Sequence, residues 1–228
     1  MGIKNRLIIM SFLQFFVWGA WLITIGNYWF GTKNWEGTQF GLVFGTMGIA
    51  SLFMPTLTGI IADRWINAEK LYGALHIVYA LVLFGIAQVT TPDNFIYVMF
   101  IAMCCYMPTI ALSNSISYTS LKLNDKNIVK DFPPIRVWGT VGFIAAMWMT
   151  NLTESKASAN QFYIAGIGAL ALGIYAFSLP KCPPSNSLEE KSTLMQKFGL
   201  DAFKLFGLLF IFIGGLIMLF GEYRSTIK

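Results

Sequence analysis

The feature that most constrains this chain is a series of apolar segments, each about as long as a bilayer is thick. Apolar runs of about 18 residues or more recur along the sequence, separated by short polar segments, and an α-helix of that length crosses the hydrocarbon of a membrane. The chain is 56% hydrophobic and 12% charged, against roughly 45–50% and 25% in soluble domains. These values predict an all-α membrane protein. The expected spans are residues 7–30, 40–62, 71–89, 95–118, 135–150 and 162–179.

The spans divide the chain into three parts. Residues 1–180 are expected to form a six-helix bundle, and residues 181–206 a cytoplasmic linker that contains an interfacial helix. Residues 207–228 begin with a short apolar run that has no polar face, which favours a short extra span over a helix lying in the interface. The first apolar run has no small-residue cleavage site at its end, so we expect no cleavable signal peptide.

The basic residues predict the orientation, because cytoplasmic loops carry an excess of Lys and Arg. Twelve lie on the side of the N-terminus and two on the other side, which predicts a cytoplasmic N-terminus. Because these charges lie in short loops between spans, the net charge of +5 does not indicate a nucleic-acid partner. The first group is Lys4, Arg6, Arg64, Lys70, Lys122, Lys126, Lys130, Arg136, Lys181, Lys191, Lys197 and Lys204, and the second is Lys33 and Lys156.

Catalysis and metal binding have no support in the sequence. Cys104, Cys105 and Cys182 lack the spacing of metal ligands, and two of them lie inside a span, so they are expected to be packing residues. No nucleophile–base pair, metal cluster or phosphate-binding loop is recognisable. We therefore expect neither an enzyme nor a bound metal or cofactor.

The fifth span carries the most informative charge. Asp131 is expected to cap the helix, with Pro133 and Pro134 in its first turn. Arg136 follows at the start of the apolar segment, where it either marks the cytoplasmic edge or serves a function, since charges in membranes are expensive. At helical spacing it shares a face with Thr140, Phe143 and Met147. A neighbouring stripe of small residues would let another helix approach closely, and consists of Gly139, Gly142 and Ala146.

Other polar side chains lie in the first, third and fourth spans. Gln14 and Trp18 share a face of the first span, where the amide either lines a cavity or bonds another helix. Asn114 lies in the fourth span among several hydroxyl residues, which indicates a wet face or further helix-to-helix bonding. His76 is the only histidine; a proton relay is conceivable, but we favour a structural role.

The second span is rich in glycine and ends in a recognisable pattern. Gly41, Gly45 and Gly48 recur at helical spacing, which predicts a seam for close packing. Gly59, Asp63 and Arg64 form Gly-x-x-x-Asp-Arg before the third span. This pattern resembles the loop motif of the major facilitator superfamily, where the Asp latches one conformation, although an ordinary capped turn is the alternative.

Several motifs together resemble the bacterial nucleoside:proton symporters, the nucleoside permeases of the major facilitator superfamily. They cover nearly all of the chain to about residue 206, yet correspond only to the N-terminal half of such a permease; the run after residue 206 is unmatched to the family. The motifs are Ser11-Phe12-Leu13-Gln14-Phe15, Trp18-Gly19, Phe53-Met54-Pro55, Gly59-Ile60-Ile61-Ala62-Asp63, Ala87-Gln88-Val89-Thr90-Thr91-Pro92, Tyr106-Met107-Pro108-Thr109, Asp125 through Phe143 and Gly199-Leu200-Asp201-Ala202-Phe203.

The resemblance implies proton-driven nucleoside uptake by alternating access, in the bacterial inner membrane. Arg136, Thr140 and Phe143 correspond to pocket residues of the family, and Gln14, Trp18 and Asn114 complete the candidate substrate site; Gly59, Asp63 and Arg64 form the candidate latch. The expected partners are a nucleoside, protons and the lipid bilayer, with a missing C-terminal half or a second copy. The alternatives are a non-transporting membrane assembly subunit and a facilitator for another solute such as a sugar.

Proton coupling needs a titratable group inside the membrane, and the expected spans contain no Asp or Glu. The coupling acid is therefore expected in the absent half. His76 is a poor substitute for it.

Overall fold

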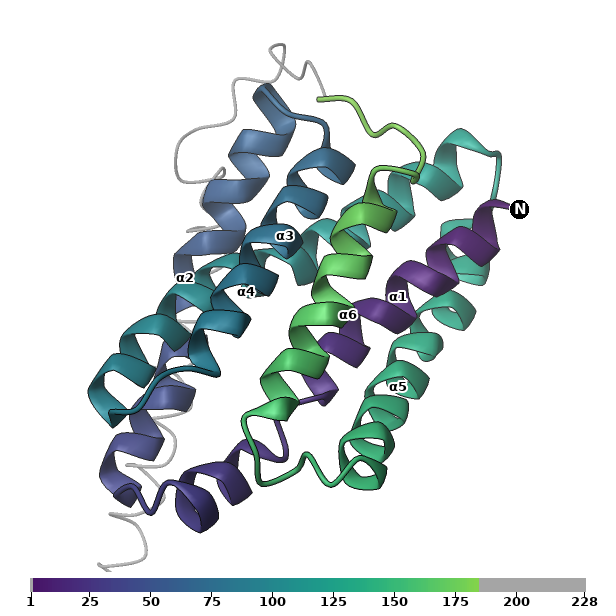
Figure 1. Ribbon diagram of the computed structural model, residues 1–228. Coiled ribbons are helices and arrows are strands. Elements are labelled where there is room, and N and C mark those ends of the chain that lie inside the picture. Colours follow the sequence, from purple (N-terminus) through teal and green to yellow (C-terminus); the bar gives the residue numbers. More distant parts are fainter. Residues whose placement is uncertain (1, 185–228) are drawn as a thin grey trace, which may run out of the picture. The chain divides into compact units, whose positions relative to one another are not determined.

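The computed structural model describes residues 2–184; the apolar run at 207–220 and most of the predicted linker lie outside the described residues. The described part is helical without strands, as the sequence predicts (Figure 1). Its elements are α1 (Ile3–Gly19), the π-helix η1 (Asn27–Thr32), α2 (Gly37–Arg64), α3 (Ala68–Ile86), α4 (Pro92–Leu123), α5 (Ile128–Leu152) and α6 (Asn160–Ala176).

The six α-helices run alternately up and down through the bundle (Figure 1). α1 packs mainly along α5 and also against α6, α3 lies between α6 and α4, and α2 packs chiefly on α4. Large side chains fill the interior, among them Trp21, Trp29, Tyr79 and Phe95, which are fully buried. α2, α3 and α4 are each long and apolar enough to cross a membrane, while α1 and α6 have 17 residues each.

Hydrogen bonds hold the segments together at both ends of the bundle. At the end that carries the N-terminus, Arg6 donates to the carbonyl of Ser178 over 3.1 Å. The backbone N–H of Cys182 donates to the buried carboxylate of Glu69 over 2.8 Å. At the opposite end, the amide of Gln39 donates to Asp93 over 2.8 Å. The helix ends that the sequence assigns to one side of the membrane therefore meet at one end of the bundle.

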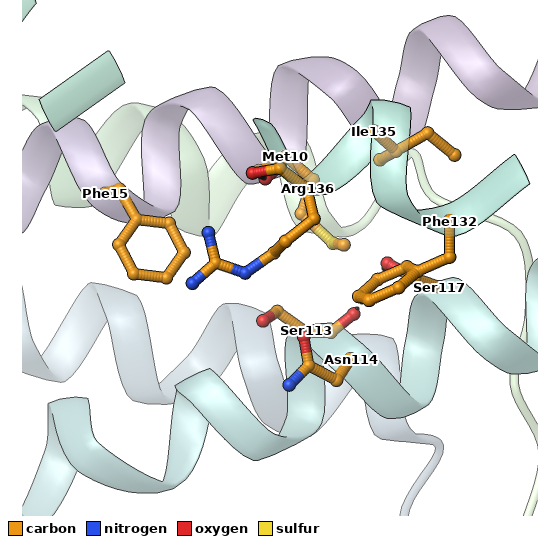
Figure 2. Close-up of a pocket in the computed structure, with 9 residues that line it drawn as sticks. Met10, Phe15, Ser113, Asn114, Ser117, Phe132, Ile135 and Arg136 are labelled. Carbon is orange, nitrogen blue, oxygen red and sulfur yellow. Dashed lines mark hydrogen bonds between the residues drawn. The ribbon is translucent and has the colours of Figure 1, made fainter. Parts of the chain in front are cut away.

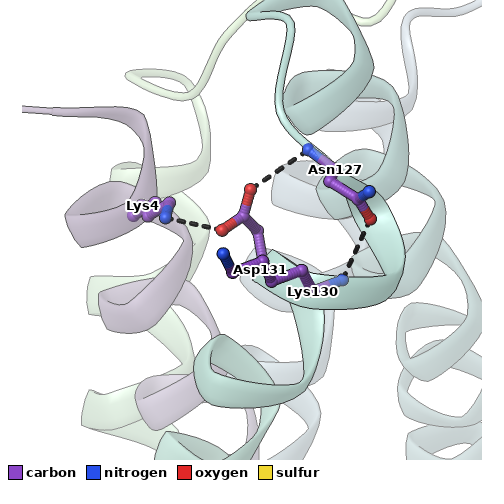
Figure 3. A network of polar contacts seen from close by, with 4 residues as sticks. All are labelled: Lys4, Asn127, Lys130 and Asp131. Carbon is purple, nitrogen blue, oxygen red and sulfur yellow. Dashed lines mark hydrogen bonds and ion pairs between the residues drawn. The ribbon is translucent and has the colours of Figure 1, made fainter.

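The start of α5 corrects one expectation about its cap. Asn127, not Asp131, is the N-cap: its side chain accepts a hydrogen bond from the Lys130 N–H over 3.1 Å. Asp131 lies one turn inside and accepts from the Asn127 N–H, while Lys4 of α1 forms an ion pair with it over 2.6 Å (Figure 3). The helix begins before the prolines because the polar residues ahead of them supply this cap, so Pro133 and Pro134 lie inside α5.

The first predicted span is not one continuous helix. α1 ends at Gly19, residues 20–24 form turns, and the chain becomes helical again at residues 25–26 and continues as η1. A Cβ on Gly19 would lie 2.5 Å from the backbone oxygen of Phe143, so α1 and α5 are close at this point. Hydropathy detected the apolar run but carries no information on where the helix breaks.

Of the two small-residue seams predicted, the structure contains one. Cβ atoms on Gly139 and Gly142 would collide with α1, which confirms the predicted close approach. Cβ atoms on Gly41, Gly45 and Gly48 would meet nothing within 4 Å among the described residues. The prediction of a packed seam on α2 is therefore wrong for the bundle of residues 2–184, because this face of α2 has no neighbour there.

Candidate functional site

A pocket lies between α1, α4 and α5, the three helices that carry most of the candidate site residues (Figure 2). Its empty volume is about 210 Å³ with its open mouth included. Three short hydroxyl side chains, one amide and one guanidinium supply its polar groups. Its lining consists of Met10, Ser11, Phe15, Ser113, Asn114, Ser117, Phe132, Ile135 and Arg136.

Among the described residues that line this pocket, Arg136 is the only charged one. Its Cζ lies 3.8 Å from the centroid of the Phe15 ring, a cation–π contact across the α1–α5 interface. Its backbone carbonyl accepts a 3.5 Å hydrogen bond from the hydroxyl of Ser11. Within residues 2–184 its guanidinium makes neither an ion pair nor a hydrogen bond. The planar fork of N–H donors is thus available to a ligand.

Asn114 is the second polar group with free hydrogen-bonding capacity. The hydroxyls of Ser113 and Ser117 donate to the backbone of their own helix, at Ile110 and Ser113 respectively, each over 2.8 Å. The partly buried amide of Asn114 has no such partner in the described bundle. An amide offers both donors and acceptors, so Arg136 and Asn114 together present complementary groups to a polar ligand.

Trp18 and Phe143 lie beyond Phe15 along the same α1–α5 interface. Their ring centroids are 6.4 Å apart, edge to face, and Trp18 also contacts Tyr106 at 5.7 Å. The indole N–H of Trp18 is buried and lacks a hydrogen-bond partner within residues 2–184. The structure therefore brings these two candidate residues together as an aromatic wall.

Thr140 lies one turn after Arg136 on α5 and is exposed in the described bundle. Its position continues the face that begins at Arg136, as the helical spacing predicts. A role for Thr140 in substrate binding stays a prediction.

Gln14 is fully buried and serves as a junction between helices. Its amide nitrogen donates to Thr109 over 2.9 Å, and its side-chain oxygen accepts from the Tyr72 hydroxyl at 2.5 Å. The Tyr106 hydroxyl donates to its backbone carbonyl over 2.8 Å. These contacts favour the helix-to-helix alternative for Gln14, and its role in substrate binding stays a prediction.

The remaining candidates lie away from the pocket. Asp63 and Arg64 are exposed at the end of α2, and neither side chain has a hydrogen bond or ion pair in the described part of the chain. The latch role of Gly59, Asp63 and Arg64 therefore stays a prediction. His76 is fully buried, and its Nδ1 lies 3.0 Å from the Tyr72 carbonyl. Because a carbonyl only accepts, Nδ1 carries the proton, in agreement with a structural histidine.

Sequence reasoning missed Phe15 and Ser11 as members of the site. Both lie on the face of α1 that meets α5. Two signals were available: both residues belong to the motif Ser11 through Phe15, and the small-residue stripe at Gly139 and Gly142 indicated that some helix approaches α5, without showing which one.

The comparisons with known proteins agree with this arrangement. A family model described as the nucleoside H⁺ symporter matches residues 1–224. The chain belongs to this family. The match extends through the apolar run at 207–220, which the motifs recognised in the sequence do not reach.

Two curated relatives show how much of a family member the chain represents. It is 49% identical to the xanthosine permease of Escherichia coli over 208 residues, which are 90% of this chain and 49% of that protein. It is 45% identical to the nucleoside permease NupG of Escherichia coli, also over 208 residues, 90% of this chain and 49% of that protein. The chain thus spans about half the length of the curated relatives it matches.

Solved structures show the fold. The crystal structure of the nucleoside transporter NupG matches with a TM-score of 0.83 and 43% identity, over 93% of this chain and 53% of that one. A mutant of NupG matches with a TM-score of 0.87 at the same identity, over 92% and 54%. The described residues form the six-helix N-terminal bundle of a major facilitator fold.

Proposed function

We propose that this chain supplies one wall of a proton-coupled nucleoside transporter. The observation that supports the proposal most is the pairing of Arg136 with Asn114 in one pocket, both with uncommitted polar groups. A nucleoside carries carbonyl and hydroxyl oxygens for the guanidinium, and ring or sugar donors and acceptors for the amide. Trp18 and Phe143, farther along the α1–α5 interface, offer aromatic rings of the kind on which a base packs.

The second wall is expected from a C-terminal half or a second copy. Alternating access rocks two bundles about a site at the bilayer midplane, so one bundle provides only part of the contacts. Thr140 supports this view, because it is exposed on the α5 face that would look toward a second bundle. Within residues 2–184 the middles of the helices also contain no Asp or Glu, so we expect the proton-coupling acid in the second half.

We propose that the N-terminus is cytoplasmic in a bacterial inner membrane. Excess Lys and Arg mark the cytoplasmic side. The described helix ends on the N-terminal side carry Lys4, Arg6, Arg64, Lys70, Lys122, Lys126, Lys130 and Lys181, whereas the opposite ends carry Lys33 and Lys156.

Uptake of radiolabelled nucleosides tests the proposal. Bacteria without their own nucleoside uptake would express either this chain alone, or this chain together with the remaining half of the xanthosine permease as a second chain. We expect accumulation of the label with both chains present, and competition by excess unlabelled nucleoside. If both chains are inserted and associate yet no nucleoside binds or enters, the proposal is wrong. Competition by a sugar but not by nucleosides would instead support a facilitator for another solute.

A further inference from the structure

We propose that Phe15 is a positioning residue, which holds the Arg136 guanidinium in the orientation that meets the substrate. This inference rests on the proposed function and assigns a role to a residue of the pocket lining that was not among the substrate-binding residues expected from the sequence. The contact that points to it is the 3.8 Å separation between Arg136 Cζ and the Phe15 ring centroid (Figure 2).

An arginine side chain is long and flexible, and ordering it costs rotamer entropy. Elsewhere in the described bundle no carboxylate, hydroxyl or carbonyl fixes this guanidinium. The Phe15 ring is therefore the group that restrains it. A ring face attracts the cation without using its N–H donors, which lie in the guanidinium plane and remain available for a bound ligand.

Phe15 is itself held rigidly. It is only 8% exposed and packs against Trp18, with ring centroids 6.3 Å apart. Gly139 creates the space that the pair occupies: a Cβ there would lie 2.6 Å from Phe15 Cδ2 and 2.7 Å from a terminal nitrogen of Arg136. The missing side chain at Gly139 thus lets the ring and the guanidinium meet at this point of the α1–α5 interface.

The first experiment reads the contact directly and needs no nucleoside. The sequence contains four arginines, Arg6, Arg64, Arg136 and Arg224, so ¹⁵N-arginine labelling of the full chain in nanodiscs gives few side-chain signals. Arg136→Lys assigns the Arg136 signal. We expect that signal to be shifted by the Phe15 ring current, to lose the shift in Phe15→Leu and to keep most of it in Phe15→Tyr. A signal that is unchanged in Phe15→Leu would overturn the proposal.

The second experiment measures function in the two-chain transporter. We expect Phe15→Leu to weaken nucleoside binding about two- to thirtyfold, the range that a cation–π contact contributes, and Phe15→Tyr to restore it. In an Arg136→Ala background, Phe15→Leu should have no further effect, because Phe15 acts through Arg136. If Phe15→Leu reduces the nucleoside affinity by the same factor in the Arg136→Ala background as in the wild type, Phe15 has a merely structural role and the proposal is overturned.

Phe16→Leu is the matched control for both experiments. Phe16 neighbours Phe15 on α1 but faces α6, where a Cβ on Gly168 would lie 3.3 Å from its ring. The same substitution there should leave the Arg136 signal and the affinity unchanged. If the wild-type transporter binds no nucleoside, the proposed function fails, while the nanodisc spectra still decide whether Phe15 orients Arg136.

Discussion

Gly142 of α5 lies directly against the backbone carbonyl of Phe12 in α1, with no room for a Cβ between them. Because the neighbouring atoms in α1 belong to the backbone of Phe12, no rotation of a side chain could make room for a larger residue at position 142. Together with Gly139, this contact sets the separation of α1 and α5. These two helices carry Arg136 and Phe15, so their separation also fixes the geometry of the candidate site.

Gly142→Ala should therefore destabilise the bundle by at least about 1–3 kcal/mol, the usual cost of overpacking a close-packed interface. Thermal unfolding of the full chain in detergent measures the effect. Gly45→Ala is the matched control, because a Cβ there meets nothing within 4 Å in the described bundle. It should be neutral or stabilise by up to about 1 kcal/mol, since Ala favours helices over Gly. Equal loss of stability in both variants would contradict the assigned packing.

Arg136→Ala should reduce nucleoside affinity at least about tenfold in the two-chain transporter, because hydrogen bonds to a charged group contribute about 1.5–3 kcal/mol. Isothermal calorimetry on purified protein gives the affinity, and thermal unfolding shows whether the fold is retained. Arg6→Ala is the control, since Arg6 donates to Ser178 at the end of the bundle. An unchanged nucleoside affinity in Arg136→Ala would contradict this prediction and support the alternative that Arg136 only marks the cytoplasmic edge of the helix.

Tyr72→Phe separates the two possible roles of Gln14. The substitution removes the donor to the buried Gln14 oxygen, and an unsatisfied buried acceptor costs about 1–3 kcal/mol. If Gln14 only joins helices, the free energy of unfolding should fall, while the nucleoside affinity should stay within about twofold of the wild-type value. Tyr97→Phe is the control, because Tyr97 is 70% exposed on α4. A large loss of affinity without loss of stability would instead support Gln14 as a substrate ligand.

The ion pair between Lys4 and Asp131 predicts a pH effect outside the apolar region. The hydrogen bond from Lys4 lowers the pKa of Asp131 below its usual value. A depressed folded-state pKa stabilises the fold above the pKa of the unfolded chain, and this contribution disappears as the pH falls through the folded-state pKa. Lys4→Met should therefore be less stable than the wild type at neutral pH and equally stable in acid. An unfolding difference that is independent of pH would contradict this.

The sequence predicted the helices and their small-residue contacts unevenly, for physical reasons. Hydropathy located six apolar segments, because the amino-acid composition of a segment decides whether it can lie in the lipid. It missed the end of α1 at Gly19 because a helix break depends on backbone geometry. Within residues 2–184 the stripe at Gly139 and Gly142 packs closely, whereas the one at Gly41, Gly45 and Gly48 meets no neighbour, because small residues permit a close approach without supplying a partner.

The site was predicted only along single helices. Periodicity placed Arg136 and Thr140 on one face of α5, because residues four apart share a helix face. Arg136 and Phe15 are 121 positions apart along the chain and lie on different helices. Their contact depends on how α1 and α5 are each rotated about their axes in the bundle, which periodicity within one helix does not reveal. Asn114 was selected from polarity alone, and the structure places it in the same pocket as Arg136.

The last prediction is that this chain alone does not concentrate nucleosides, and that any transport it shows is indifferent to the proton gradient. In the described bundle Asp and Glu lie only in loops and near helix ends. His76 is a poor proton carrier, because its protonated Nδ1 is bound to the Tyr72 carbonyl and its other nitrogen is buried without a partner among residues 2–184. The test is uptake into proteoliposomes with and without an inside-alkaline pH step, using protein of known oligomeric state. We expect the same nucleoside uptake with and without the pH step, and no accumulation above the outside nucleoside concentration. Proton-driven accumulation that His76→Gln abolishes would refute the prediction and assign the coupling role to His76.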